Sequence, residues 1–276
     1  MKNEIKKHPI YGECLYLTNE TVEVYVPLSF GLRIGHFSFV GEENVFFEQP
    51  LDMEMFTTPD GWKIRGGHRM WLAPESEKCY APDNEPISYT LTDDGVILTQ
   101  KEDMRLRVIK ELRLSFDGAR VRVTHKITNT KDEEQTYSLW AISVMRSGGV
   151  ETIKLPLRDG GMDHMHRISM WDYTSLGDER AKYSRDKIEI THLPLDTKYK
   201  IGVGHPISPV RYENGSTVFL KHFDVLRSAT YPDADVSYET FFSKYMVEME
   251  SLSPLYTLKP RESREHTEIW ELLRKE

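Results

Sequence analysis

The sequence lacks the features that mark several large classes of protein. Its 276 residues include only two cysteines, which have no CxxC spacing and are expected to be free thiols. No apolar run approaches the roughly 20 residues of a membrane-spanning helix, and the opening MKNEIKKHPIYGECLYL lacks the apolar segment of a signal peptide. The net charge of −8 disfavours nucleic acid and anionic membrane surfaces as partners. We therefore expect a cytoplasmic protein that binds neither nucleic acid nor membranes.

Familiar catalytic motifs are also missing from the sequence. It contains no GxSxG, no P-loop and no dinucleotide fingerprint, which argues against serine hydrolysis, phosphoryl transfer and Rossmann-type redox chemistry. Repeats, low-complexity segments and composition shifts are absent as well, so we expect a single domain over residues 1–276 and no cofactor.

What the sequence does contain is the alternation of β-strands. In TVEVYV, Val22, Val24 and Val26 share one face, and KELRLSF and ARVRVTHKIT alternate in the same way between Gly- and Asn-rich turns. YSLWAISVM is apolar on both faces, as is typical of a central strand. The final REHTEIWELLRKE fits a helix or a strand equally well. The pattern predicts an all-β fold, a large and mostly antiparallel sandwich.

The stretch IRGGHRMWLAPE gathers polar donors around two glycines. Arg65, His68 and Arg69 surround Gly66-Gly67, which indicates either a turn whose basic residues face water or a cradle for an oxygen-rich ligand that the glycines let approach. Asp83, in YAPDNEP, is either an ordinary turn aspartate or an acceptor for sugar hydroxyls. Two arginines make an anionic ligand plausible.

The segment FFSKYMVEMES carries two carboxylates at strand spacing. Read as one strand, it places Glu248 and Glu250 on one face and Phe241, Val247 and Met249 on the other. The acidic face is either solvated or forms a cleft floor where a carboxylate acts as a general base or binds hydroxyls.

Three other features bear on possible sites. His164 and His166 in DHMHR share a strand face, as in a cupin-like metal site, but no glutamate follows, so we expect no metal. The irregular segment 154–186 is either a functional loop or a surface excursion in which Trp171 covers a sheet edge. His125, on the apolar face of its strand, is expected to be a core histidine.

Four stretches together resemble the galactose-mutarotase-like superfamily of aldose 1-epimerase type, in particular a bacterial branch without a settled function. VYVPLSFGLRIGHFSFVGEENVFF is similar to the family's opening hairpin, and IRGGHRMW resembles a segment of hexose-6-phosphate mutarotases. ITNTKDEEQTYSLWAISV resembles the strand after an Asn-Thr turn, and VEMESLSPLYTLKPRES resembles the family's acidic strand and the turn that follows it. The resemblance implies a β-supersandwich with a sugar site on a sheet face.

In the family's mutarotases a glutamate takes the proton of the anomeric hydroxyl and a histidine protonates the ring oxygen. The resemblance assigns the glutamate to Glu248 or Glu250, while Trp140 stands where the histidine is expected. An indole is only a hydrogen-bond donor, although it can stack on a sugar, so His68 is the best replacement for the acid. We expect Arg65, Arg69, Asp83 and Trp140 to bind the sugar, which could be phosphorylated.

Three functions follow from this resemblance and these departures. The chain could be a carbohydrate-binding protein that interconverts sugar anomers by acid–base catalysis. It could instead be a carbohydrate-binding domain that has lost catalysis with the family histidine. A cupin-like metalloprotein is the weaker alternative.

Overall fold

The chain folds almost entirely into antiparallel β-strands. The computed structural model describes residues 1–157 and 166–275. Within these residues the helices are one 3₁₀ turn, η1 (Glu77–Tyr80), and one short helix, α1 (Pro232–Asp235). None of the helices in the described ranges has the length and apolar character that crossing a bilayer requires. The predicted all-β class and the antiparallel pairing are confirmed.

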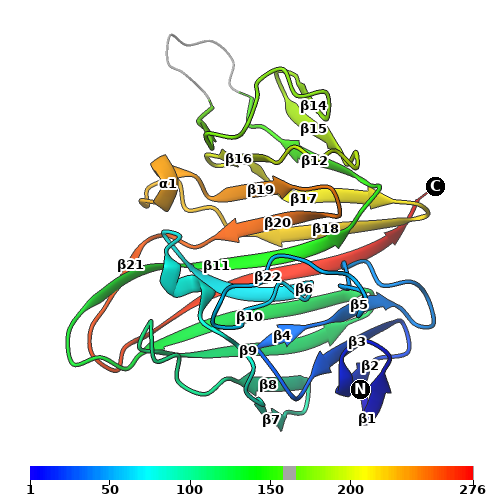
Figure 1. Cartoon of the computed structure of the whole chain (residues 1–276), viewed down its shortest axis with the longest axis vertical. Helices are drawn as coiled ribbons and strands as arrows, with labels where there is room; N and C mark the ends of the chain where they lie inside the picture. Colours follow the sequence, from blue (N-terminus) through cyan, green and yellow to red (C-terminus); the bar gives the residue numbers. More distant parts are fainter. Residues whose placement is uncertain (158–165, 276) are drawn as a thin grey trace.

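The largest sheet has ten strands and holds the C-terminal strand near its centre (Figure 1). Its strands, from one edge to the other, are β14 (Ala181–Tyr183), β15 (Lys187–Thr191), β12 (Val150–Lys154), β17 (Ile207–Asn214), β18 (Thr217–Phe223), β22 (Ser263–Arg274), β10 (Arg120–Asn129), β9 (Val108–Asp117), β8 (Gly95–Thr99) and β7 (Ser88–Leu91).

The second large sheet has eight strands and carries the site described below. Its order is β13 (Ile168–Met170), β16 (Tyr199–Val203), β19 (Tyr238–Phe242), β20 (Met246–Leu252), β11 (Gln135–Arg146), β6 (Gly67–Ala73) and β4 (Arg33–Ile34), with β21 (Tyr256–Leu258) pairing with β11. Strand β11 lies between β20 and β6, and Leu139 to Met145 are buried throughout, as the apolar run YSLWAISVM predicts.

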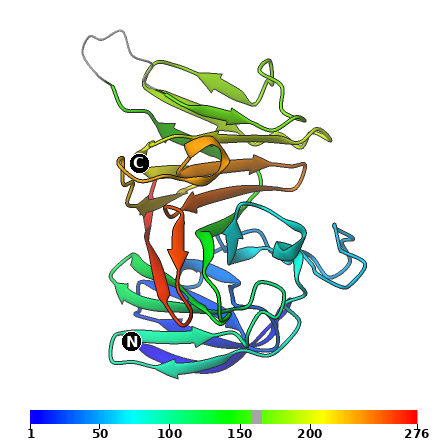
Figure 2. The same ribbon diagram turned by 90° about the vertical axis from the view of Figure 1, so that its left-hand side faces the viewer.

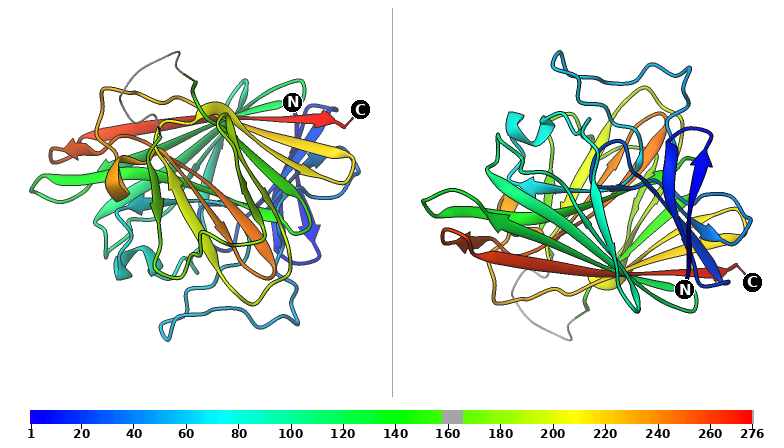
Figure 3. Two further views of the ribbon diagram at one scale, coloured as in Figure 1. Left: turned by 90° about the horizontal axis from the view of Figure 1, so that it is seen from above. Right: turned by 90° about the horizontal axis from the view of Figure 1, so that it is seen from below.

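A smaller sheet contains the N-terminal residues, in blue at the lower right of Figure 1. Its order is β1 (Lys2–His8), β2 (Gly12–Thr18), β3 (Val22–Pro27) and β5 (His36–Phe39). The long segment between β5 and β6 projects from the sheets at the right of Figure 2 and in both views of Figure 3.

Each strand of the eight-stranded sheet sends alternate side chains to opposite faces. One face, which we call the core face, packs on the ten-stranded sheet; in β6 it receives His68, Met70 and Leu72. The opposite face, which we call the pocket face, receives Arg69 and Trp71. Both faces are covered, so all seven residues of β6 are buried.

The C-terminal segment, for which helix and strand were both open, is strand β22. Its alternate residues Trp270 and Leu272 are buried in the main core, where apolar side chains from both large sheets meet. The segment FFSKYMVEMES is not one strand. It is a hairpin of β19 and β20, closed by a hydrogen bond from the Ser243 amide to the Met246 carbonyl, and Phe241 pairs with Glu248 and shares its face.

Candidate functional site

A pocket of about 670 Å³ lies on the pocket face of the eight-stranded sheet. Its floor is formed by Arg69 and Trp71 of β6, Trp140 of β11 and Glu248 of β20. These side chains share the pocket because paired residues of antiparallel strands point to the same face, and β6, β11 and β20 are adjacent.

The lining of the pocket is rich in tryptophan. Four of the five tryptophans of the sequence line it: Trp62, Trp71, Trp140 and Trp171. The ring centroids of Trp71 and Trp140 are 5.6 Å apart and those of Trp62 and Trp71 are 5.4 Å apart, so these three rings form one continuous cluster. Trp171 comes from the irregular segment 154–186, which therefore contributes directly to the pocket.

Arg69 and Glu248 form an ion pair on the floor. The Nη2 of Arg69 lies 2.9 Å from Oε1 of Glu248, and the guanidinium lies 4.6 Å from the centre of the Trp71 ring. Arg69 is only 4% exposed, yet its Nε and Nη1 have no hydrogen-bond partner. Buried donors usually find a partner, whereas these two N–H groups have none among the described residues, in a side chain that lines the pocket. The hydroxyl of a ligand could accept a hydrogen bond from Arg69 and donate one to Glu248.

Glu250 lies below the floor and is fully buried. Its Oε2 accepts hydrogen bonds from Nε1 of Trp140 at 2.8 Å and from Nζ of Lys200 at 3.3 Å. The Lys200 ammonium is also 2.8 Å from Oε2 of Glu239 and lies between the rings of Trp140 and Trp171, 4.6 and 4.5 Å from their centres. The indole and the ammonium therefore separate Glu250 from the pocket.

These contacts set the protonation of the cluster. Burial raises the pKa of Glu250 to about 7, although Lys200 opposes the shift. Burial also raises the pKa of Glu239 well above its usual range. Burial opposes the charge on Lys200, but Glu250 and Glu239 outweigh it and raise its pKa above the ordinary value. One cation thus faces two carboxyls that hold their protons unusually tightly.

His68 does not enter the pocket, and this corrects the expected convergence of His68 with Arg69. The two residues are neighbours on β6, so their side chains point to opposite faces. His68 is fully buried on the core face, where burial lowers the pKa of its imidazole well below the ordinary value.

The contacts of His68 form a directed chain of hydrogen bonds across the core. Nδ1 of His125 donates to the carbonyl of His266 at 2.9 Å, so its Nε2 accepts from Nε2 of His68 at 2.7 Å. Nδ1 of His68 then accepts from the Ser143 hydroxyl at 2.9 Å, and that oxygen accepts from Lys221 at 3.0 Å. Both His68 and His125 have hydrogen-bond partners for both ring nitrogens as neutral imidazoles, so His125 is the core histidine that its strand position predicts.

Arg65 and Asp83 lie outside the pocket lining. Asp83 is 3.2 Å from the buried guanidinium of Arg33, and Arg65 stacks at 3.9 Å over the ring of Phe30. The expectation that they join Arg69 in one site is therefore not met, because Arg65 precedes β6 and turns away at a positive φ of 56°.

The two glycines serve the chain's own backbone. A Cβ at Gly66 would lie 2.0 Å from the Phe47 carbonyl oxygen, and one at Gly67 would lie 2.4 Å from that of Ile34. Gly66 and Gly67 also have φ values of +85° and +71°, which favour glycine. The two glycines allow neighbouring backbone segments, rather than a ligand, to approach closely.

Two groups of histidine and glutamate in the described ranges are close enough to suggest metal ligands. The first is His68, His125 and Glu268. Glu268 already accepts from Lys221 at 3.0 Å, and this ammonium would repel a cation. The group therefore does not suit a metal.

The second group is His8, His36 and Glu48. Nδ1 of His8 accepts the amides of Ile10 and Tyr11 at 3.3 and 3.4 Å, so the proton of this ring is on Nε2, which faces Glu48 at 3.4 Å. A metal at Nε2 would require the other tautomer. His164 lies outside the described residues, and so does the metal site that was weighed for His164 and His166.

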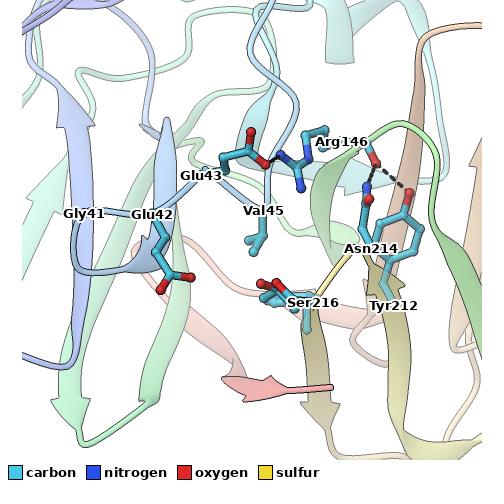
Figure 4. Close-up of a pocket in the computed structure, with 11 residues that line it drawn as sticks. Gly41, Glu42, Glu43, Val45, Arg146, Tyr212, Asn214 and Ser216 are labelled. Carbon is cyan, nitrogen blue, oxygen red and sulfur yellow. Dashed lines mark hydrogen bonds and ion pairs between the residues drawn. The ribbon is translucent and has the colours of Figure 1, made fainter. Parts of the chain in front are cut away.

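Another pocket, of about 350 Å³, opens between the β5–β6 segment and β17–β18 (Figure 4). Its polar groups are satisfied within the chain: Arg146 pairs with Glu43, and the Arg146 carbonyl accepts from Tyr212 and Asn214. It has none of the unpartnered donors of the first pocket.

Comparison with solved structures places this arrangement in a known fold. A candidate aldose 1-epimerase from Escherichia coli superposes with a TM-score of 0.62 at 10% identity, over 99% of this chain and 100% of that one. The chain has the galactose-mutarotase-like fold. A galactose mutarotase-like protein from Lactobacillus casei has a TM-score of 0.62 at 9% identity (94% and 100% covered), and one from Clostridium acetobutylicum has 0.59 at 10% (99% and 99%). No protein-family model and no curated protein matches the sequence.

Several pocket residues of this mutarotase-like fold were not predicted. Trp71 was visible in IRGGHRMW but was not among the expected sugar-binding residues, and Lys200 sits within the apolar strand YKIGV, where a lysine is unusual. A lysine in an apolar strand was therefore the feature of the sequence that could have indicated this part of the site. Trp62 lies outside regular strands and gave no comparable signal, whereas Trp171 and Tyr173 belong to the irregular segment 154–186, for which a functional loop was one of the two interpretations.

Proposed function

We propose that the pocket of this mutarotase-like fold binds a carbohydrate. The observation that carries the proposal is the Arg69–Glu248 pair on the floor, which combines two unpartnered N–H donors with a carboxylate acceptor beneath aromatic walls. A sugar presents hydroxyls that both donate and accept, and C–H faces that pack on aromatic rings, so it matches both parts of the site.

The charges of the lining favour a neutral sugar. Four basic and four acidic side chains line the pocket: Arg69, Lys198, Lys200, Lys244, Glu54, Glu75, Asp196 and Glu248. This balance gives no net attraction for a phosphate or carboxylate group, so a neutral sugar suits the pocket better than an anionic one.

The geometry of the pocket supports sugar binding without turnover better than it supports catalysis. Glu250 is covered by Trp140 and Lys200, and the described pocket offers no histidine beside Glu248. One observation favours the second candidate, anomer exchange: the raised pKa of Glu250, about 7, suits a general base near neutral pH. Polarimetry on freshly dissolved α-glucose and α-galactose tests this candidate, and a rate equal to that in buffer would eliminate it.

The binding proposal is tested by Arg69→Lys. Lysine keeps the charge opposite Glu248 but lacks the planar guanidinium that presents the two unpartnered N–H groups. We expect the affinity for a bound aldohexose, measured by isothermal titration calorimetry, to fall about 10- to 100-fold. Arg113→Lys, at an exposed ion pair with Asp94 on the ten-stranded sheet, is the matched control and should change nothing. Equal affinities in both variants, or no sugar bound by the wild type, would contradict the proposal.

A further inference from the structure

Exposed aromatic side chains gather at the mouth of the pocket. The described residues include five exposed aromatic side chains, and three of them line this pocket: Phe56 at 63%, Tyr173 at 43% and Tyr245 at 42%. Because each one both lines the pocket and faces solvent, each stands where the pocket opens. Exposed apolar surface concentrated at one place is characteristic of a binding site.

The three rings come from three separate segments. Phe56 belongs to the projecting β5–β6 segment (Figures 2 and 3), Tyr173 to the segment after β13, and Tyr245 to the β19–β20 turn. None of these segments supplies the floor residues Arg69 or Glu248. The pocket therefore has two zones, a buried polar floor and an exposed aromatic mouth.

The polar groups of the floor are concentrated at one place. Its donors and its acceptor lie together on β6 and β20, and the Trp71 and Trp140 rings close around them. A ligand confined to the floor would leave the mouth rings in water. Pockets of roughly 300–1,000 Å³ enclose ligands larger than a single hexose, and this one measures about 670 Å³.

We propose that the pocket takes the end of a neutral saccharide chain, with one unit on the Arg69–Glu248 floor and the next units against Phe56, Tyr173 and Tyr245. This inference rests on the proposed carbohydrate binding and names its ligand class. The mouth also offers polar partners for hydroxyls, since Lys244 and Asp196 form an exposed ion pair at 2.8 Å.

Calorimetric titrations with glucose, galactose and mannose and with their α- and β-linked di- and trisaccharides test this inference. At least one trisaccharide should bind the wild type about tenfold more tightly than its monosaccharide. Phe56→Ala and Tyr245→Ala should each weaken that trisaccharide about fivefold, through lost ring contact, and leave any monosaccharide affinity unchanged. Tyr89→Ala, at a tyrosine of similar exposure (38%) outside the pocket, is the control and should leave both affinities unchanged.

The outcomes separate the two proposals. If monosaccharides bind and lengthening gives no gain, or if the mouth variants weaken short and long ligands equally, the chain inference is wrong while carbohydrate binding stands. If no saccharide of any length binds the wild type, both are wrong. If only the longer saccharides bind, and Phe56→Ala weakens them, both are supported.

Discussion

Replacing Glu250 by glutamine should change stability in a way that depends on pH. The pKa of this buried carboxyl is about 7 in the folded protein, against 4.5 for the unperturbed group. Between these values the unfolded chain has released the proton and the folded chain keeps it, so the folded state binds more protons. Stability of the wild type therefore falls as pH rises through this window. The difference corresponds to about 3 kcal/mol.

Glutamine mimics the protonated carboxyl and cannot release a proton. The free energy of unfolding of Glu250→Gln minus that of the wild type should therefore increase by about 3 kcal/mol between about pH 4.5 and about pH 7. Urea denaturation followed by tryptophan fluorescence measures both proteins, and the exposed Glu134→Gln is the control, with a difference that stays constant. A difference for Glu250→Gln that also stays constant would refute our account of the cluster beneath the pocket.

Three further changes test the core and the site. Burial lowers the pKa of His125 to about 3, so the wild type loses stability as pH falls below about 6.5. His125→Asn keeps a donor to the His266 carbonyl but cannot take up this proton. In urea titrations, the variant should therefore lose about 2 kcal/mol less than the wild type between pH 7 and pH 5. Gly66→Ala should lower the free energy of unfolding by about 2–4 kcal/mol, because its φ is positive and its Cβ would meet the Phe47 carbonyl; an unchanged melting temperature would contradict this. Lys200→Met should cost about 3–5 kcal/mol at pH 8 and less at pH 5, where the two carboxyls it contacts can be protonated; equal losses at both pH values would rule out the charge argument.

Much of the fold could be predicted from local pattern. Alternation identified the antiparallel strands, and the run from Leu139 to Met145 identified the central strand, because burial on both faces leaves no room for polar residues. Glu248 and Glu250 were correctly placed on one face of their strand, since the two-residue period holds within β20. The pattern could not say that Glu248 reaches the pocket and Glu250 does not, because this depends on the Trp140 and Lys200 side chains from other strands.

The errors at the site have two physical sources. His68 and Arg69 were grouped by closeness in sequence, although within a strand adjacent residues diverge; applying the two-residue period to GHRMWLA would have separated them. Tyr173 and Trp171 reach the pocket from an irregular segment, whose path is set by tertiary contacts and leaves no periodic trace in the sequence.

Residue 140 is a tryptophan where the resemblance to mutarotases leads us to expect a histidine, and this difference affects both carboxylates of strand β20. Where a histidine could hold and transfer a proton, the Trp140 indole only donates a hydrogen bond to Glu250. The other partner of Glu250, Lys200, has a raised pKa and keeps its proton more tightly than a free lysine. Both neighbours therefore hold Glu250 in place, but neither is suited to protonate a ring oxygen. Glu248, two residues earlier and on the same face, carries the accessible carboxylate, and its partner Arg69 brings unused donors. Trp140 thus covers one carboxylate while the other lines the pocket, and under the proposed function this is the arrangement expected of a site that binds a sugar without opening its ring.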